Sequence, residues 1–102
     1  MIARIWRAAA TTPGAAAYTK HFHDSVLPSL RSLDGYRDAY LLNRDTGDGS
    51  VEIQVISLWE SLESIRAFTG EGRELTTAVV EPEAQAVLTS FDGTVTHHDV
   101  VV

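Results

Sequence analysis

The sequence contains no cysteine among its 102 residues, which excludes disulfide frameworks, thiolate nucleophiles and thiolate metal sites. It also lacks any apolar run near the roughly 20 residues that a membrane-spanning helix needs. Arginines interrupt its first residues, so no apolar stretch of signal-peptide length is present there. We therefore expect a cytoplasmic protein with no membrane partner.

Basic charge is scarce as well. Eight lysines and arginines face 14 acidic residues, which gives a formal net charge of −6, and the arginines are scattered singly. An acidic surface repels phosphate backbones, so a nucleic-acid partner is not expected. The hydrophobic fraction of 44% is that of an ordinary globular protein, and the length is that of one domain covering residues 1–102.

The hydrophobic pattern predicts four strands and two main helices. Alternating or β-branched residues predict strands at 2–8, 36–44, 51–59 and 94–101. A stripe at spacings of three and four predicts a helix over 15–33, capped by Thr12 and bent by Pro28. A second helix is expected from Ser61 to Gly70 and a short third one from Glu81 to Leu88.

This order, β-α-β-β-α-(α)-β, predicts an α+β fold of the ferredoxin-like kind. The six-residue loop at 45–50 joins its two flanking strands as an antiparallel hairpin. Both helices would cover one face of the antiparallel sheet and leave an apolar face bare. Because a bare apolar sheet face needs covering, we expect a homodimer packed sheet to sheet.

Four segments of the chain resemble the antibiotic biosynthesis monooxygenase superfamily of dimeric α/β-barrel proteins. They are MIARIWRA, LPSLRSLDGYRDAYLLNR, VISLWESLESIRAFTGE and FDGTVTHHDV. The resemblance implies a pocket between sheet and helices, with Trp59 at the end of the third strand lining it. The haem-degrading members place an asparagine on the first strand and a histidine after the tryptophan. This chain has neither, so no haem and no other cofactor is expected.

Cofactor-independent oxygenation needs a base, donors for a phenolate oxygen and a dry aromatic pocket. Trp6 shares one strand face with Arg4, and the two tryptophans offer stacking surface and indole N–H groups. Arg4 is a candidate to hold an oxyanion, or alternatively to pair with Glu52 or Asp99.

Histidine is the side chain whose ordinary pKa lies nearest neutrality. His21 and His23 point to different sides of their helix; we expect His23 to face inward beside Leu27 and Leu30, as the catalytic base, and His21 to be solvated. His97 and His98 face opposite sides of a strand, and neither pair has metal-ligand geometry, so no metal site is expected.

The remaining expected substrate contacts are Phe22 and Leu27 on the first helix and Tyr40, which regular alternation places on one strand face with Tyr36. The sequence thus predicts a monooxygenase-like protein, free of cofactors, acting on a small aromatic or polyketide-like substrate. The alternative is a non-catalytic dimer that binds a small ligand in the same pocket, and a third possibility is a purely structural module.

Overall fold

The computed structural model describes all 102 residues of the chain. Its strands are β1 (Ile2–Thr11), β2 (Tyr36–Asp45), β3 (Ser50–Trp59), β4 (Ser90–Phe91) and β5 (Thr96–Asp99). Its helices are α1 (Thr12–His21), a π-helical turn (Phe22–Val26), α2 (Leu27–Arg31), α3 (Leu62–Thr69) and α4 (Pro82–Gln85). No helix is both long and apolar enough to span a membrane.

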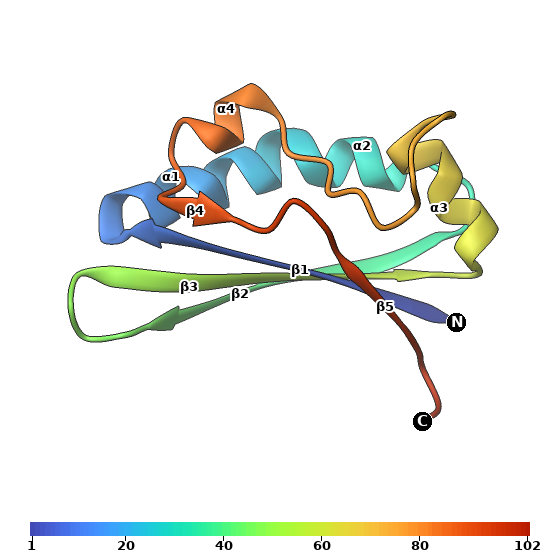
Figure 1. Ribbon diagram of the computed structural model, residues 1–102, viewed down its shortest axis with the longest axis horizontal. Helices are drawn as coiled ribbons and strands as arrows, with labels where there is room; N and C mark the ends of the chain where they lie inside the picture. Colours follow the sequence, from blue (N-terminus) through green and yellow to red (C-terminus); the bar gives the residue numbers. More distant parts are fainter.

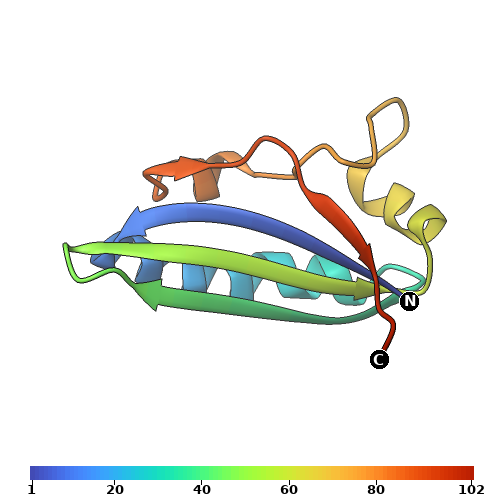
Figure 2. The same cartoon turned by 60° about the horizontal axis from the view of Figure 1, so that its bottom comes forward.

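The strands form one antiparallel sheet in the order β2-β3-β1-β4. The strand β5 also pairs with β1, nearer the start of β1 than β4 does. The predicted α+β class and the β2–β3 hairpin are confirmed. All helices lie on one side of the sheet, and no element covers the other face (Figures 1 and 2). The final strand is shorter than expected, and β4 was not predicted because two exposed residues carry no periodic pattern.

Alternation along the two long central strands places one set of side chains under the helices. On β1 these are Arg4, Trp6 and Ala10, all buried, as the period of two predicts. On β3 the buried residues Val51 and Ile53 share this face. The helix-covered face is therefore the one that carries the core.

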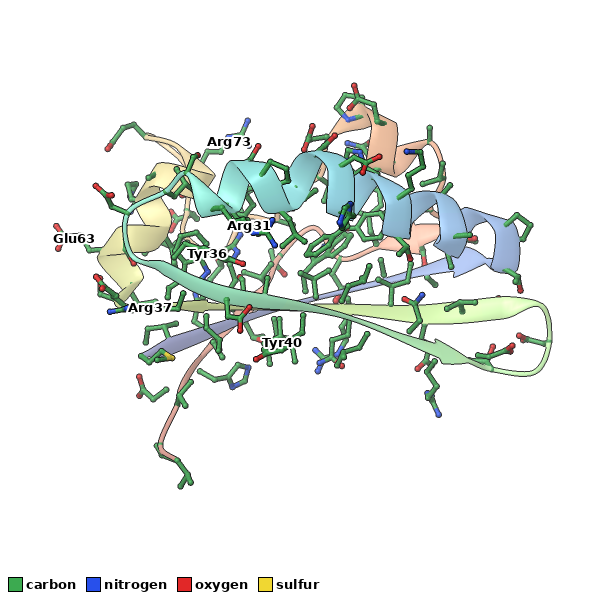
Figure 3. The ribbon with its side chains drawn as sticks, turned by 180° about the vertical axis from the view of Figure 1, so that it is seen from behind. Arg31, Tyr36, Arg37, Tyr40, Glu63 and Arg73 are labelled. Atoms are coloured by element: carbon green, nitrogen blue, oxygen red, sulfur yellow. The ribbon has the colours of Figure 1, made fainter.

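A β-bulge at the start of β2 changes which residues share a face. The pairing with β3 shifts between Tyr36 and Asp38, so an extra residue enters β2 there. As a result Tyr36 points toward the helices, whereas Tyr40 points to the uncovered face with 49% of its surface exposed (Figure 3). The expectation that both tyrosines share one face is wrong for this reason.

The predicted first helix is present but consists of three segments. It begins at Thr12, after an N-cap supplied by Thr11, whose side chain accepts a hydrogen bond from the Gly14 N–H. The irregularity expected at Pro28 takes the form of a π-helical turn just before it, in which the Leu27 N–H donates to the Phe22 carbonyl. Pro28 then lies in the first turn of α2, where its missing N–H costs little.

The segment after α3 crosses back over the helix-covered face. It is held there by a close contact between its backbone and α1. A Cβ on Gly14 would lie 2.4 Å from the Val87 carbonyl oxygen, so only glycine allows α1 and this segment to meet there. The Gln85 side chain donates to the Val80 carbonyl, and Val95 N–H donates to that of Thr76. Residues 75–88, here called the covering segment, thus close the layer of helices.

Two groups of buried side chains fill the space between sheet and helices. The larger one, here called the Trp6 cluster, also contains Ala10, Ala15, Tyr18, Phe22, Val51, Ile53, Ala84 and Val95. The smaller one, here called the Trp59 cluster, consists of Trp59, Leu30 and Ile65. The candidate site lies where these two groups approach each other.

Candidate functional site

A cavity of about 50 Å³ lies between the sheet and its covering helices. Eleven of its fifteen lining residues are hydrophobic, and they come from β1, β3, the first helix, α3, the covering segment and Val95 just before β5. The polar lining residues are Arg4, Ser57, His21 and Glu81. An apolar enclosure with a few inward polar groups is the usual form of a small-molecule site.

Arg4 is a buried cation that no carboxylate neutralises. It is 4% exposed, and its guanidinium donates to the carbonyl oxygens of Leu75 at 2.6 Å and Thr77 at 2.7 Å. A third bond runs from Nη1 to His97 Nε2 at 3.0 Å, which fixes the His97 proton on Nδ1 because arginine cannot accept. Of the two pairings considered for Arg4, Glu52 binds Arg44 instead, and no hydrogen bond or ion pair joins Asp99 to Arg4.

The charge of Arg4 persists at neutral pH despite its burial. Burial lowers the pKa of its guanidinium to about 10. The cation also lies over the Phe68 ring, 5.6 Å from the ring centroid, which offsets part of its desolvation. Partial burial lowers the pKa of His97, and the charge of Arg4 lowers it further, so this imidazole stays neutral beside Arg4. The cavity therefore presents a positive wall.

The two histidines of the first helix occupy the reverse of their expected positions. His21 lines the cavity, with 12% of its side chain exposed, whereas the side chain of His23 is 78% exposed and hydrogen-bonds to Asp24. The inward orientation expected for His23 is wrong because the π-helical turn widens the helix after residue 21 and breaks the spacing that aligned His23 with Leu27. His21 instead follows Tyr18 by three residues and shares its face.

Trp59 lies behind the cavity wall rather than in it. It is fully buried, and its indole N–H donates to Ser57 Oγ at 2.8 Å. Its ring packs against Tyr36 and Phe68, with centroids 5.7 and 5.9 Å away. Because Ser57 and Phe68 do line the cavity, Trp59 positions two lining residues without contacting the space itself.

The structure brings some of the expected contact residues to the cavity and leaves others outside. Trp6 and Phe22 line it, and the Trp6 indole N–H donates to the Asp92 carbonyl at 2.8 Å. Leu27 packs against the Trp6 cluster without lining the cavity, and Tyr40 lies on the uncovered face. Sequence reasoning missed Glu81, which precedes α4, and the covering segment gave no periodic signal that could have found it.

No three side chains of the metal-ligating types gather in one place. His97 and His98 lie on opposite faces of β5, with His97 beside Arg4 and His98 on the uncovered face, as alternation predicts.

No family model matches the sequence, and no curated protein matches it. Solved structures do. A candidate antibiotic biosynthesis monooxygenase from Bacillus cereus matches with a TM-score of 0.63 at 13% identity, over 99% of this chain and 91% of that one. A second, from Deinococcus radiodurans, matches with 0.59 at 13% identity, over 98% and 92%. The haem degrader MhuD from Mycobacterium tuberculosis matches with 0.61 at 19% identity, over 100% and 97%. The chain therefore has the fold of these proteins, as the resemblance predicts.

The haem that MhuD holds does not fit the site seen here. Sites for ligands of drug size measure about 300–1,000 Å³, and this cavity of about 50 Å³ is far smaller. Of the two inward histidines, His97 already uses Nε2 to accept from Arg4. His21 Nε2 forms no hydrogen bond, but it is buried, and the cavity beside it is too small for a porphyrin ring.

Proposed function

We propose that this chain is a monooxygenase-like protein that binds a small aromatic substrate in the cavity and oxidises it with molecular oxygen, without a resident cofactor. The observation that carries the proposal is the buried Arg4 guanidinium, which lines a largely apolar cavity and forms no ion pair. An isolated buried charge is costly unless it is paired. A substrate that becomes an oxyanion supplies that pairing.

The chemistry asks little of the protein beyond this arrangement. A naphthol or hydroquinone loses its hydroxyl proton, and the resulting anion is the species that reduces oxygen. One oxygen atom enters the ring as a quinone carbonyl and the other leaves as water, so the substrate supplies every electron. Arg4 stabilises the anion electrostatically, and the dry apolar walls formed by Trp6, Phe22 and Val55 keep water from it.

Substrate entry requires the cavity to widen, and the covering segment is the element that can move. It contributes Val79, Val80 and Ala84 to the cavity wall. It is held by Arg4 through the carbonyls of Leu75 and Thr77, and by a short antiparallel bridge in which Val95 N–H donates to the Thr76 carbonyl and Ala78 N–H to that of Gly93. An incoming anion competes with these neutral carbonyls for the same guanidinium, so binding and widening are coupled.

Oxygen uptake by the purified protein, without added metal or cofactor, tests the proposal. The substrates are a panel of naphthols and of one- to four-ring hydroquinones. We expect saturable uptake that falls at least tenfold in Arg4→Met, because the methionine side chain fills similar space without charge. Arg44→Met is the matched control, since Arg44 is exposed and pairs with Glu52. Uptake unchanged in Arg4→Met would show that the cation has no part in the chemistry.

A second candidate function is ligand binding without chemistry, and the small volume of the cavity favours it. A protein of this kind raises its melting temperature with a naphthol yet consumes no oxygen. Thermal shift and oxygen uptake measured on the same samples separate the two functions.

We also propose that the uncovered sheet face joins two copies of the chain. It carries Ile5, Leu42, Ile56 and Leu58, with Leu42 46% exposed in the single chain. Such a face on a lone domain calls for a partner surface of the same kind. Light scattering at micromolar concentration should give twice the 11.1 kDa chain mass, and Leu42→Asp should give the single mass. A single mass for the unmodified protein contradicts the dimer.

A further inference from the structure

His21 carries a buried polar atom with no partner. Its Nε2 is the only buried side-chain nitrogen or oxygen in the protein that forms no hydrogen bond. Most buried polar atoms in folded proteins are hydrogen-bonded, so an exception at a cavity wall suggests a missing partner. The imidazole is fixed from one side by Tyr18, whose ring centroid lies 6.1 Å from its own.

Glu81 faces the same atom across a gap of defined width. Its Oε1 lies 3.8 Å from His21 Nε2, which is too long for a direct hydrogen bond. A hydroxyl about 2.8 Å from Nε2 would donate its one proton to this atom. Glu81 is the residue before α4 and caps no helix N–H with its side chain, so its carboxylate has no competing partner there. Glu81 is therefore placed to stabilise a positive charge on His21.

The other titratable groups around His21 are poorly suited to accept a proton. Burial, and then the charge of Glu81, raises the pKa of Tyr18, so this phenol stays protonated. Arg4, from β1, is the cation of the cavity and has no acceptor atom. On the same helix, Lys20 and Asp24 pair with each other at the surface. His21 and Glu81 are the acceptors that remain.

We propose that a hydroxyl of the aromatic substrate donates to His21 Nε2 and that His21 accepts its proton, with the Glu81 carboxylate beside the imidazole. The inference rests on the proposed function in assuming that the cavity takes an aromatic ligand. It assigns a hydroxylated ring as the substrate class and His21 as the catalytic base, in the place expected of His23.

The proton step balances within the cavity. The ligand O–H bond breaks, an N–H bond forms at His21 Nε2, and the oxygen keeps the electron pair as a phenolate. The imidazole becomes an imidazolium, which the Glu81 carboxylate stabilises, and the phenolate gains the attraction of Arg4. Starting with the Nδ1-protonated form of His21, Nε2 has the free lone pair that this step needs.

A chromogenic phenol measures the step directly, without turnover. The probe is 4-nitrophenol, whose ionised form absorbs at longer wavelength, at a pH below its own pKa. We expect bound probe to show the phenolate band, and calorimetry in two buffers to show no proton released to solvent. In His21→Gln the band should fall about tenfold or more, which corresponds to at least one unit in the pKa of the bound probe.

Two controls fix the interpretation. His23→Gln makes the same change at the exposed neighbour and should leave the band unchanged. The methyl ether 4-nitroanisole has no proton to give and should bind at least tenfold more weakly. Equal binding of the ether, loss of the band in His23→Gln, or a phenolate band that persists in His21→Gln overturns the inference, as does failure of 4-nitrophenol to bind. Ionised probe with no oxygen uptake from any phenol defeats the proposed function alone.

Discussion

Trp6 and Trp59 lie on neighbouring strands and face the same side of the sheet, yet their surroundings differ. Trp6 borders the cavity, and its indole N–H donates to the carbonyl of Asp92 in the C-terminal part of the chain. Trp59 is enclosed by Tyr36 and Phe68, with its N–H satisfied inside the core by Ser57. Burial of an aromatic side chain thus serves two purposes here: Trp6 shapes a space, and Trp59 supports the residues that form its wall.

Among the variants that test this difference, Trp59→Ala should lower the stability of the protein most. Replacing a fully buried tryptophan by alanine costs about 3–5 kcal/mol of unfolding free energy, because contacts are lost and a void remains. Urea unfolding followed by circular dichroism measures the loss. Trp6→Ala should cost less, since Trp6 already borders empty space. An equal or larger loss for Trp6→Ala contradicts the distinction.

Ser57→Ala tests whether the Trp59 indole depends on its buried acceptor. The substitution leaves Nε1 buried and unpaired, which costs about 1–3 kcal/mol. The matched control is Ser57→Thr, which keeps a hydroxyl in reach and should retain most of the stability. If alanine and threonine are equally stable, the hydrogen bond contributes nothing to the Trp59 cluster.

Trp6→Phe should lower the stability less than Trp59→Ala does, and it should change ligand binding more. The lost donor faces the Asp92 carbonyl, and Asp92 is exposed, so water replaces it at a net cost of about 1 kcal/mol. The smaller ring enlarges the cavity, so the affinity for a naphthol should rise. Thermal shift with and without 2-naphthol measures both effects. Unchanged affinity would show that Trp6 does not limit the space for a ligand.

Much of this arrangement could be predicted from the sequence, because strand and helix periods set which residues face the core. Alternation placed Arg4 and Trp6 together on one strand face, and spacing placed Phe22 on the apolar stripe of the first helix; both are confirmed. The errors come from single inserted residues. The bulge after Tyr36 separated it from Tyr40, and the π-helical turn left His23 in solvent. Hydrophobic spacing cannot detect an extra residue that the backbone absorbs locally.

The short helix of the covering segment was expected and is present as α4, but the place of the segment over the cavity could not be predicted, for a different reason. Its place is fixed by tertiary contacts, such as the approach of the Val87 carbonyl to Gly14 and the bonds from Arg4 to backbone carbonyls. Backbone carbonyls are present at every position, so no residue type marks those that receive a guanidinium. Glu81 reaches the cavity on this segment and was missed with it.

Arg4 lies between the Trp6 cluster and the Trp59 cluster, and its neighbour His97 should make the stability of the protein depend on pH. Arg4 lines the cavity with Trp6, while its guanidinium lies over Phe68, a neighbour of Trp59, and donates to His97. Partial burial lowers the pKa of His97 below its ordinary 6.5, and the charges of Arg4 and His98 lower it further. The unfolded chain therefore binds a proton at His97 before the folded protein does, and stability falls as the pH drops below about 6.5.

His97→Gln should remove this part of the pH dependence, because glutamine keeps an acceptor for Arg4 but does not titrate. We expect the variant to lose less stability than the unmodified protein between pH 7 and pH 5. The difference should be at most about 1 kcal/mol, since solvent reaches His97 and screens the repulsion. Urea midpoints at both pH values measure it, with His98→Gln on the uncovered face as the control. Parallel losses in the unmodified protein and His97→Gln would mean that Arg4 tolerates a charged neighbour and that the region between the two clusters is open to solvent.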